Sequence, residues 1–196
     1  LPILTSAGHF NHHDMRHFLL FACLLWSAAL AAQTSRTDID AFKKQNALNP
    51  PKTRSILFAG SSSFTYWIDY QASFPDFDII NRGFGGSTLA EQMTYYEDVI
   101  KPCRPRQIVL YCGENDFAQD EQLTPKAVFE RFRLLFEKTR KDMPDVQFSY
   151  VSMKPSPARQ HLMPKFQKAN HLIKKYLARQ PNTAYIDVFS KMVKAD

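Results

Sequence analysis

The stretch ILFAGSSSFTYW, residues 56 to 67, places an apolar run directly before a glycine and three serines. A short apolar run that ends at glycine is typical of a buried strand, and the residues that follow predict a helix. The serines therefore occupy a strand-to-helix turn. Such a turn can expose a nucleophile or bind an anion, because a helix start has unpaired N–H groups and partial positive charge. The alternative is a structural N-cap, a position that serine favours.

Five runs along the chain predict strands, because they are short, apolar or β-branched, and bounded by turn residues. They are SILFA (55–59), FDII (77–80), QIVLYC (107–112), QFSYVS (147–152) and TAYIDV (183–188). Residues between these runs repeat at helical spacing, and Thr124-Pro125 predicts a helix start with an N-cap and an N1 proline. The alternation predicts an α/β fold, a three-layer α/β/α arrangement with a mostly parallel five-stranded sheet, flavodoxin-like.

The composition is that of one globular domain. Of the 196 residues, 44% are hydrophobic and 22% are charged, which is ordinary for a folded domain of this length. The net charge of +6 is spread along the chain without a run of five like charges. We therefore predict no nucleic-acid binding, because the basic residues fall on solvated helix faces.

The first 53 residues divide into three segments before the predicted domain, 54–196. Residues 15–32 read as a signal peptide, with a positive start, the apolar run FLLFACLLWSAAL and small residues for cleavage. This predicts a secreted or periplasmic protein without a membrane span in its mature form, since the run is shorter than the roughly 20 residues of a span. A buried N-terminal helix is the alternative. Residues 1–14 are an upstream leader, and 33–53 form a polar N-terminal lead-in with a helix near 38–48.

Export would leave two cysteines, Cys103 and Cys112, in an oxidising compartment. They could form one disulfide. Cys112 ends an apolar strand, however, which favours a role as a small core residue.

Polar, glycine-bearing turns follow the first three predicted strands: residues 60–63 (GSSS), 81–88 (NRGFGGST) and 113–116 (GEND). The carboxyl ends of parallel strands meet at one edge of a sheet, where ligands bind. GFGGST is not a dinucleotide fingerprint, because its third glycine position is Thr88, and no P-loop lysine follows. Together the turns suit ester hydrolysis, in which a serine attacks a carbonyl while a glycine amide and an asparagine side chain donate to the oxyanion.

These three ordered blocks resemble those of the SGNH hydrolases, also called GDSL-like lipases and acylhydrolases, over about residues 54–190. The resemblance implies that Ser62 is the nucleophile and that Gly86 and Asn115 help to form the oxyanion hole. It implies no metal and no organic cofactor. Ser61 stands where the family usually has aspartate, which suggests a GSSS variant branch.

The family's last block, Asp-x-x-His, is missing after the fifth strand, where only FSKMVKAD remains. The literal match at 14–17 falls at the start of the signal peptide. His161 and His171 are the histidines of the mature domain, and we expect both at the surface. We therefore expect a C-terminally truncated chain that is nearly inactive and leaves one sheet face uncovered.

The expected activity of the parent protein is hydrolysis of acyl esters, acetyl or short-chain, of a carbohydrate or a lipid, through an acyl-enzyme. The alternative is a non-catalytic module that binds a glycan or an anion on the same fold. Four aromatic residues near the turns could line a substrate pocket, although we expect core packing for at least half of them. They are Phe64, Tyr66, Trp67 and Phe84.

Overall fold

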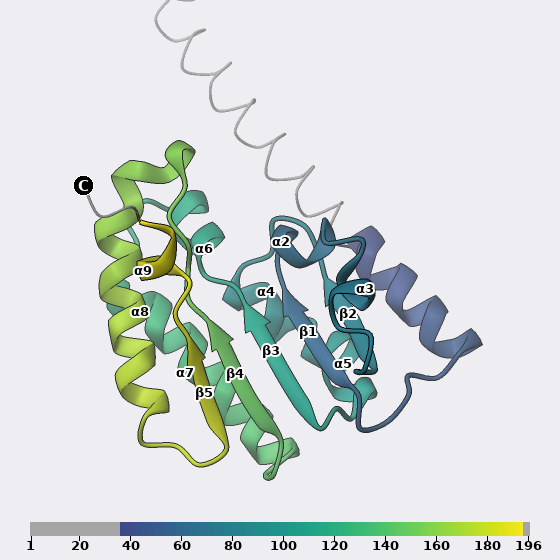
Figure 1. Cartoon of the computed structure of the whole chain (residues 1–196). Helices are drawn as coiled ribbons and strands as arrows, with labels where there is room; N and C mark the ends of the chain where they lie inside the picture. The colour runs from purple at the N-terminus through teal and green to yellow at the C-terminus, as the bar shows by residue number, and fades with distance from the viewer. Residues whose placement is uncertain (1–35, 194–196) are drawn as a thin grey trace, which may run out of the picture.

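Five parallel strands form the sheet in this computed structural model, which describes residues 36–193 (Figure 1). The strands are β1 (Ile56–Gly60), β2 (Ile79–Gly83), β3 (Gln107–Tyr111), β4 (Gln147–Val151) and β5 (Thr183–Ile186). Their spatial order is β2-β1-β3-β4-β5, and each pair is parallel. This is the flavodoxin-like order, so the predicted α/β fold class is confirmed.

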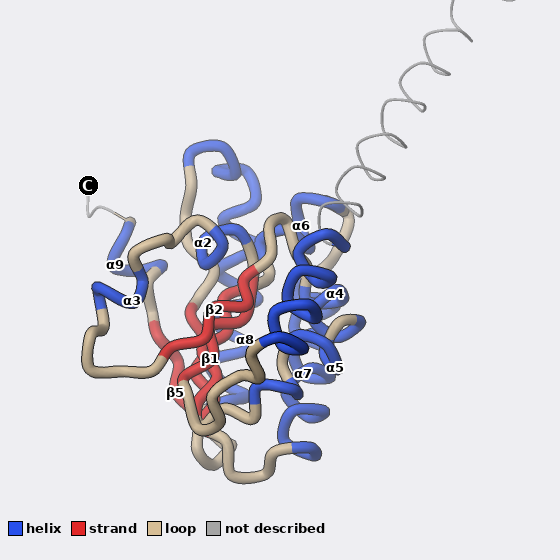
Figure 2. Tube along the Cα trace, turned by 90° about the vertical axis from the view of Figure 1, so that its right-hand side faces the viewer, coloured by secondary structure: helices blue, strands red, loops and turns tan. Residues whose placement is uncertain are grey.

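Helices cover the two faces of the sheet unequally (Figure 2). We call the first the core face, which is covered by α4 (Leu89–Thr94), α5 (Tyr96–Val99), α7 (Pro125–Asp142) and α8 (Met163–Leu177). We call the other the groove face, which is flanked by α2 (Ser62–Thr65), α3 (Tyr70–Ser73) and α9 (Phe189–Met192). Three short helices complete the connections: η1 (Lys101–Cys103), α6 (Glu114–Gln119) and η2 (Pro157–Leu162).

The core face is closely packed because alternate strand residues point into the two long helices. Thr124 caps α7 as predicted, with its hydroxyl oxygen accepting from the Ala127 amide at 3.1 Å. From α7, Phe132 packs edge-on against Tyr150 of β4, with ring centroids 5.0 Å apart. Both side chains are fully buried. This face therefore holds most of the hydrophobic core.

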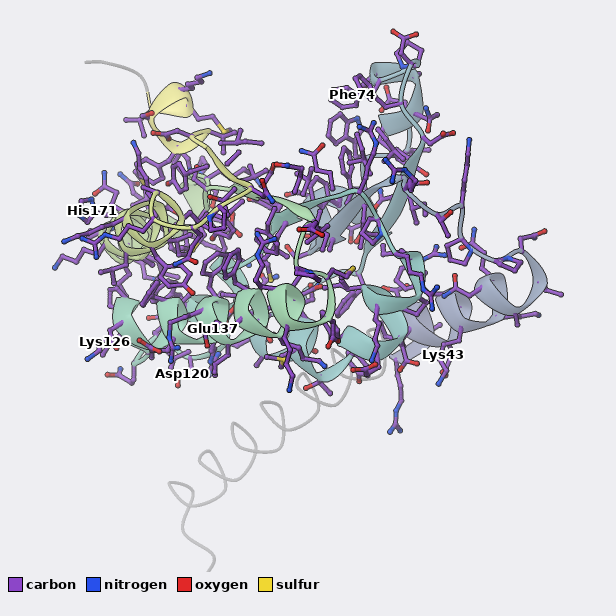
Figure 3. All side chains as sticks on the ribbon, turned by 90° about the horizontal axis from the view of Figure 1, so that it is seen from below. Lys43, Phe74, Asp120, Lys126, Glu137 and His171 are labelled. Atoms are coloured by element: carbon purple, nitrogen blue, oxygen red, sulfur yellow. The ribbon has the colours of Figure 1, made fainter. Side chains whose placement is uncertain are left out.

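The groove face carries the other alternate strand residues, and a cavity of about 630 Å³ lies over them. The apolar side chains that the strands contribute to it are Ile56, Phe58, Ile79, Val109, Val151 and Ile186. Figure 3 shows α3, with Phe74, and α9 standing apart on this side of the sheet. Phe74, Phe77 and Ile186 keep 38%, 44% and 41% of their surface exposed. The groove face is thus partly open within the described residues.

Two predictions are wrong, and the fifth strand, expected at 183–188, ends earlier, at Ile186. The strand expected at 77–80 is β2, Ile79–Gly83, so the first residues of NRGFGGST belong to the strand. Buried Arg82 fits there because its guanidinium donates to Gln45 at 2.7 Å and Asn46 at 2.6 Å. The helical spacing over 89–100 yields two short helices, because the backbone leaves helical geometry at Tyr95.

Residues 36–48 are helical, close to the helix expected at 38–48. The predicted leader, 1–14, and signal peptide, 15–32, lie outside the described residues. None of the helices in the described part is both long and apolar enough to cross a bilayer. Cys103 and Cys112 are free and buried, which agrees with the core role favoured for Cys112 and shows no disulfide between them.

Candidate active site

The three polar turns lie side by side at the carboxyl edge of the sheet, where α2, α4 and α6 begin (Figure 1). The carbonyl oxygen of Gly60, which ends β1, joins the first turn to the second. It accepts from the Phe84 amide at 3.0 Å, from the Ser87 hydroxyl at 3.1 Å and from Gln92 Nε2 at 3.1 Å. Because Ser87 and Gln92 are fully buried, these bonds fix the distance between the two turns.

The serine turn is forced by close backbone packing. Gly60 has φ +144°, and a Cβ there would overlap the carbonyl oxygen of Tyr111 in β3. The Ser61 amide donates to that same carbonyl oxygen at 3.0 Å. Ser61 occupies the N-cap position of α2 but makes no side-chain cap hydrogen bond, so the structure does not support the capping alternative. Half-buried Ser62 follows, and its hydroxyl has no hydrogen-bond partner among residues 36–193.

Gly86 lies at the exposed tip of the second turn. Its φ of +73° is the left-handed conformation that glycine adopts without strain, and a Cβ there would meet open space. Its carbonyl oxygen accepts from Gln119 Nε2 at 3.3 Å, which links the turn to α6. The backbone at Gly86 is therefore accessible to solvent, while the hydrogen bond from Gln119 restrains the conformation of the turn.

Asn115, in the first turn of α6, is 8% exposed, and both ends of its amide are paired. Nδ2 donates to the Ser87 carbonyl oxygen at 3.0 Å, and Oδ1 accepts from Arg159 Nη2 at 2.8 Å. An amide nitrogen carries two hydrogens, so one N–H remains for a ligand. The structure thus brings Asn115 next to Gly86 through Ser87 and places Ser62 on the same sheet edge.

The aspartate of the GEND block has a structural role. Asp116 Oδ2 accepts from the Leu89 amide at the start of α4, at 2.9 Å, and Oδ1 pairs with Arg131 of α7 at 2.7 Å. Burial raises the pKa of Asp116, and the bonds to Arg131 and Leu89 act against that rise. Asp116 therefore holds the second and third turns together.

Glu114 belongs to a buried polar group that the sequence of the GEND block does not predict. One carboxylate oxygen accepts from the Tyr111 hydroxyl and, at 3.1 Å, from the Lys154 amide. Burial raises the pKa of Glu114. The Lys154 ammonium donates to the Ser63 hydroxyl at 3.0 Å, beside the predicted nucleophile.

Both histidines of the described part lie at the surface, as expected. His161 Nε2 pairs with Glu121 at 3.0 Å, and both side chains are more than half exposed. His171 is exposed on the outer side of α8 (Figure 3). No group of three or more histidine, cysteine or acidic side chains within residues 36–193 could hold a metal ion.

Of the four aromatic residues near the turns, Phe64 and Phe84 are buried and belong to the core. Phe64 also lines the groove, beside Trp67, whereas Tyr66 is 78% exposed. Half of the set therefore packs in the core, as expected. Buried Cys112 is no candidate nucleophile, because burial raises the pKa of its thiol.

Comparison with protein-family models and with curated protein sequences finds no match. Solved structures do match. A Streptococcus pneumonia protein, provisionally described as a platelet activating factor, has a TM-score of 0.72 at 17% identity, covering 92% of this chain and 84% of its own. A GDSL-like lipase from Bacteroides thetaiotaomicron has a TM-score of 0.66 at 18% identity, covering 81% of each chain.

A third match is a catalytic mutant of an acetylxylan esterase from Geobacillus stearothermophilus. Its TM-score is 0.56 at 14% identity, covering 74% of this chain and 84% of its own. The chain therefore has the fold found in solved GDSL-like lipases and acylhydrolases, which confirms the architecture that the sequence resemblance implied.

Proposed function

We propose that the protein is a serine ester hydrolase that removes an acyl group, acetyl or short-chain, from a carbohydrate or a lipid. The observation that carries the proposal is that hydrogen bonds join the polar turns at the carboxyl edge of the sheet. There Asn115 Nδ2 bonds to Ser87 beside Gly86, and Ser62 has an unpaired hydroxyl among residues 36–193. Acyl transfer requires a free hydroxyl close to hydrogen-bond donors whose positions are fixed.

In the proposed reaction, Ser62 Oγ attacks the acyl carbonyl carbon and gives its proton to a general base. The oxyanion accepts from the amides of Ser62 and Gly86 and from the free N–H of Asn115. Collapse of the tetrahedral intermediate releases the alcohol, which takes a proton, and leaves an acyl group on Ser62. Water then gives a proton to the base and attacks this ester, the acyl group leaves as a carboxylic acid, and Ser62 Oγ takes the proton back.

The nature of the substrate is a separate part of the proposal. The matched structures include acetylxylan esterases and GDSL-like lipases, which supports an acetylated carbohydrate or a lipid ester. The predicted signal peptide at 15–32 is compatible with either in a secreted or periplasmic setting. Initial rates on acetylated xylooligosaccharides and on p-nitrophenyl esters of increasing chain length would separate the two. We expect the acetyl ester to react fastest.

The decisive test compares Ser62→Ala with Ser73→Ala, which changes an exposed serine of α3. The assay is p-nitrophenyl acetate hydrolysis by the product of the complete reading frame, so that any Asp-x-x-His block encoded past residue 196 is present. We expect Ser62→Ala to lower kcat on the order of 10⁴- to 10⁶-fold, because the nucleophile is lost. Ser73→Ala should retain the rate of the unmodified enzyme. Equal turnover in both variants would refute the assignment of Ser62.

The second candidate is a non-catalytic module that binds a glycan or an anion. It is favoured by two observations: His161 and His171 are both exposed at the surface, and the cations Lys154 and Arg159 adjoin the turns. Isothermal titration with an acetylated oligosaccharide separates the two functions. Binding without turnover, unchanged by Ser62→Ala, would support the module and contradict the hydrolase.

A further inference from the structure

The segment after β4 reaches two of the three turns, although the proposed reaction does not use it. Its sequence KPSPAR, residues 154–159, contains two prolines, whose rings fix φ. Lys154 Nζ donates to Ser63 Oγ at 3.0 Å, and Arg159 Nη2 donates to Asn115 Oδ1 at 2.8 Å. One short segment therefore contacts both the serine turn and the asparagine turn.

The start of this segment is anchored by buried hydrogen bonds. The Met153 amide donates to Asn170 Oδ1 of α8, and Asn170 Nδ2 donates to the Met153 carbonyl oxygen, both at 3.0 Å. The Ser152 hydroxyl oxygen accepts from the amides of Val188 and Phe189, also at 3.0 Å each. These bonds attach the segment to α8 and to the turn after β5. The backbone that leads to Arg159 is thus held in place at its start.

Arg159 decides which way the Asn115 amide faces. A guanidinium has donors only, so it can pair with Oδ1 but not with Nδ2. The Ser87 carbonyl oxygen accepts only, so it selects Nδ2 at the other end. In this orientation both partners are satisfied. The rotated amide would place an oxygen against the Ser87 carbonyl oxygen and a nitrogen against the cation.

The charge of Arg159 also acts on the donor strength of Asn115. A hydrogen bond from a guanidinium is charge-assisted and roughly twice as strong as a neutral one. It polarises the amide, which makes the N–H groups at the opposite end better donors. Since Asn115 is buried, loss of Arg159 would leave its oxygen unpaired, and the bond to Ser87 alone would restrain the amide less firmly.

We infer that Arg159 is a positioning residue that orients and polarises the Asn115 amide for the oxyanion, and that the inference rests on the proposed hydrolase function. Arg159 acts through Asn115 and does not bind the ester itself. Its loss therefore affects kcat and leaves KM nearly unchanged. The effect also requires that Asn115 be present.

A double-mutant cycle tests this dependence in the complete reading-frame product with p-nitrophenyl acetate. We expect Asn115→Ala to lower kcat by about 10²- to 10³-fold, as for loss of an oxyanion donor. Arg159→Gln should lower kcat by roughly 10- to 100-fold, since the donor remains but is less polarised and less firmly oriented. The double variant should be no slower than Asn115→Ala alone. Arg159→Lys should recover part of the rate because it restores a cationic donor.

Two results would overturn the inference. One is an Arg159→Gln loss that multiplies in full with Asn115→Ala, or that appears mainly in KM, because Arg159 would then act on the substrate directly. The other is an Arg159→Gln rate equal to that of the unmodified enzyme. Arg179→Gln, which changes an exposed arginine after α8, is the matched control. Thermal melts show whether each variant is folded, and Arg159→Lys supplies a milder change if Arg159→Gln is not.

A second measurement separates this inference from the proposed function. Should the unmodified protein hydrolyse no ester, the side-chain ¹⁵N–¹H resonances of Asn115 still report its orientation. They are identified by their disappearance in Asn115→Ala. We expect Arg159→Gln to shift these resonances and speed their exchange with water, while Arg179→Gln leaves them in place. Unchanged resonances in Arg159→Gln would overturn the positioning role, whatever the activity.

Discussion

The two faces of the sheet are built from the same strands but differ in how completely they are covered. On the core face, Phe132, Phe148 and Tyr150 are 0%, 2% and 0% exposed. On the groove face, Phe77 and Ile186 remain 44% and 41% exposed beside a cavity of about 630 Å³. Buried apolar area determines stability, so the core face should supply most of the folding free energy.

The candidate site depends mainly on the core face. Gln92 of α4 bonds to Gly60, Arg131 of α7 pairs with Asp116, and Asn170 of α8 holds Met153. From the groove side, Lys154 holds Ser63. Changes on the core face should therefore disturb both stability and the site, whereas changes on the groove face should do little to either.

The largest effect is expected from Phe132→Ala, which removes a buried aromatic ring from the core face. The loss of a buried aromatic ring leaves a cavity and should lower the free energy of unfolding by about 3–5 kcal/mol. Phe77→Ala is the groove-face counterpart and should cost less than about 1 kcal/mol, because Phe77 is already 44% exposed. Urea unfolding followed by circular dichroism measures both. Similar losses in the two variants would contradict the inequality of the faces.

A smaller effect should follow Arg131→Ala, which tests the link between the core face and the site. Asp116 is fully buried and would lose its counter-cation, which we expect to cost about 2 kcal/mol after allowing for the 35% exposure of the Arg131 side chain. Arg133→Ala, on the same helix, removes exposed pairs with Glu130 and Glu137 and should cost less than about 1 kcal/mol. Urea midpoints of the two variants make the comparison; a greater loss in Arg133→Ala would rule out this role for Arg131.

The core face and the order of the turns could be predicted from the sequence because both follow local patterns. Strand runs, helical spacing and the cap at Thr124 are short-range signals, and parallel topology brings the post-strand turns together. The limits of β2 could not be predicted, since the burial of Arg82 depends on partners far away in the sequence, such as Gln45 and Asn46. Contacts between residues so far apart in the chain produce no periodic pattern in the sequence.

The same reason explains what sequence reasoning missed at the site. Arg159 lies 44 residues from Asn115, and Lys154 lies 91 residues from Ser63. The KPSPAR segment contains two prolines, but nothing in its local pattern indicates which side chains it contacts. Its position directly after β4, at the ligand-binding edge of a parallel sheet, is the signal that could have directed attention to it.

The smallest effect concerns the burial of one carboxyl group where the groove face meets the candidate site. Glu114 lies there, bonded to Tyr111 and Lys154, and burial raises its pKa above the ordinary value of 4.5. The folded state then binds this proton more tightly than the unfolded state does. Glu114 therefore costs no stability below the unfolded pKa, and its cost grows as the pH rises through the folded pKa.

Glu114→Gln removes this dependence and isolates the contribution of the carboxyl group. We expect the free energy of unfolding of the variant, relative to the unmodified protein, to increase as the pH rises from the ordinary glutamate pKa of 4.5 through the raised pKa of the folded state. Glu130→Gln, in a partly exposed ion pair on α7, is the control and should show little such trend. Urea unfolding across this pH range measures the difference. If Glu114→Gln instead lost stability relative to the unmodified protein as the pH rose, then the bonds from Tyr111 and Lys154 would outweigh burial, and the groove side would stabilise the charged carboxylate.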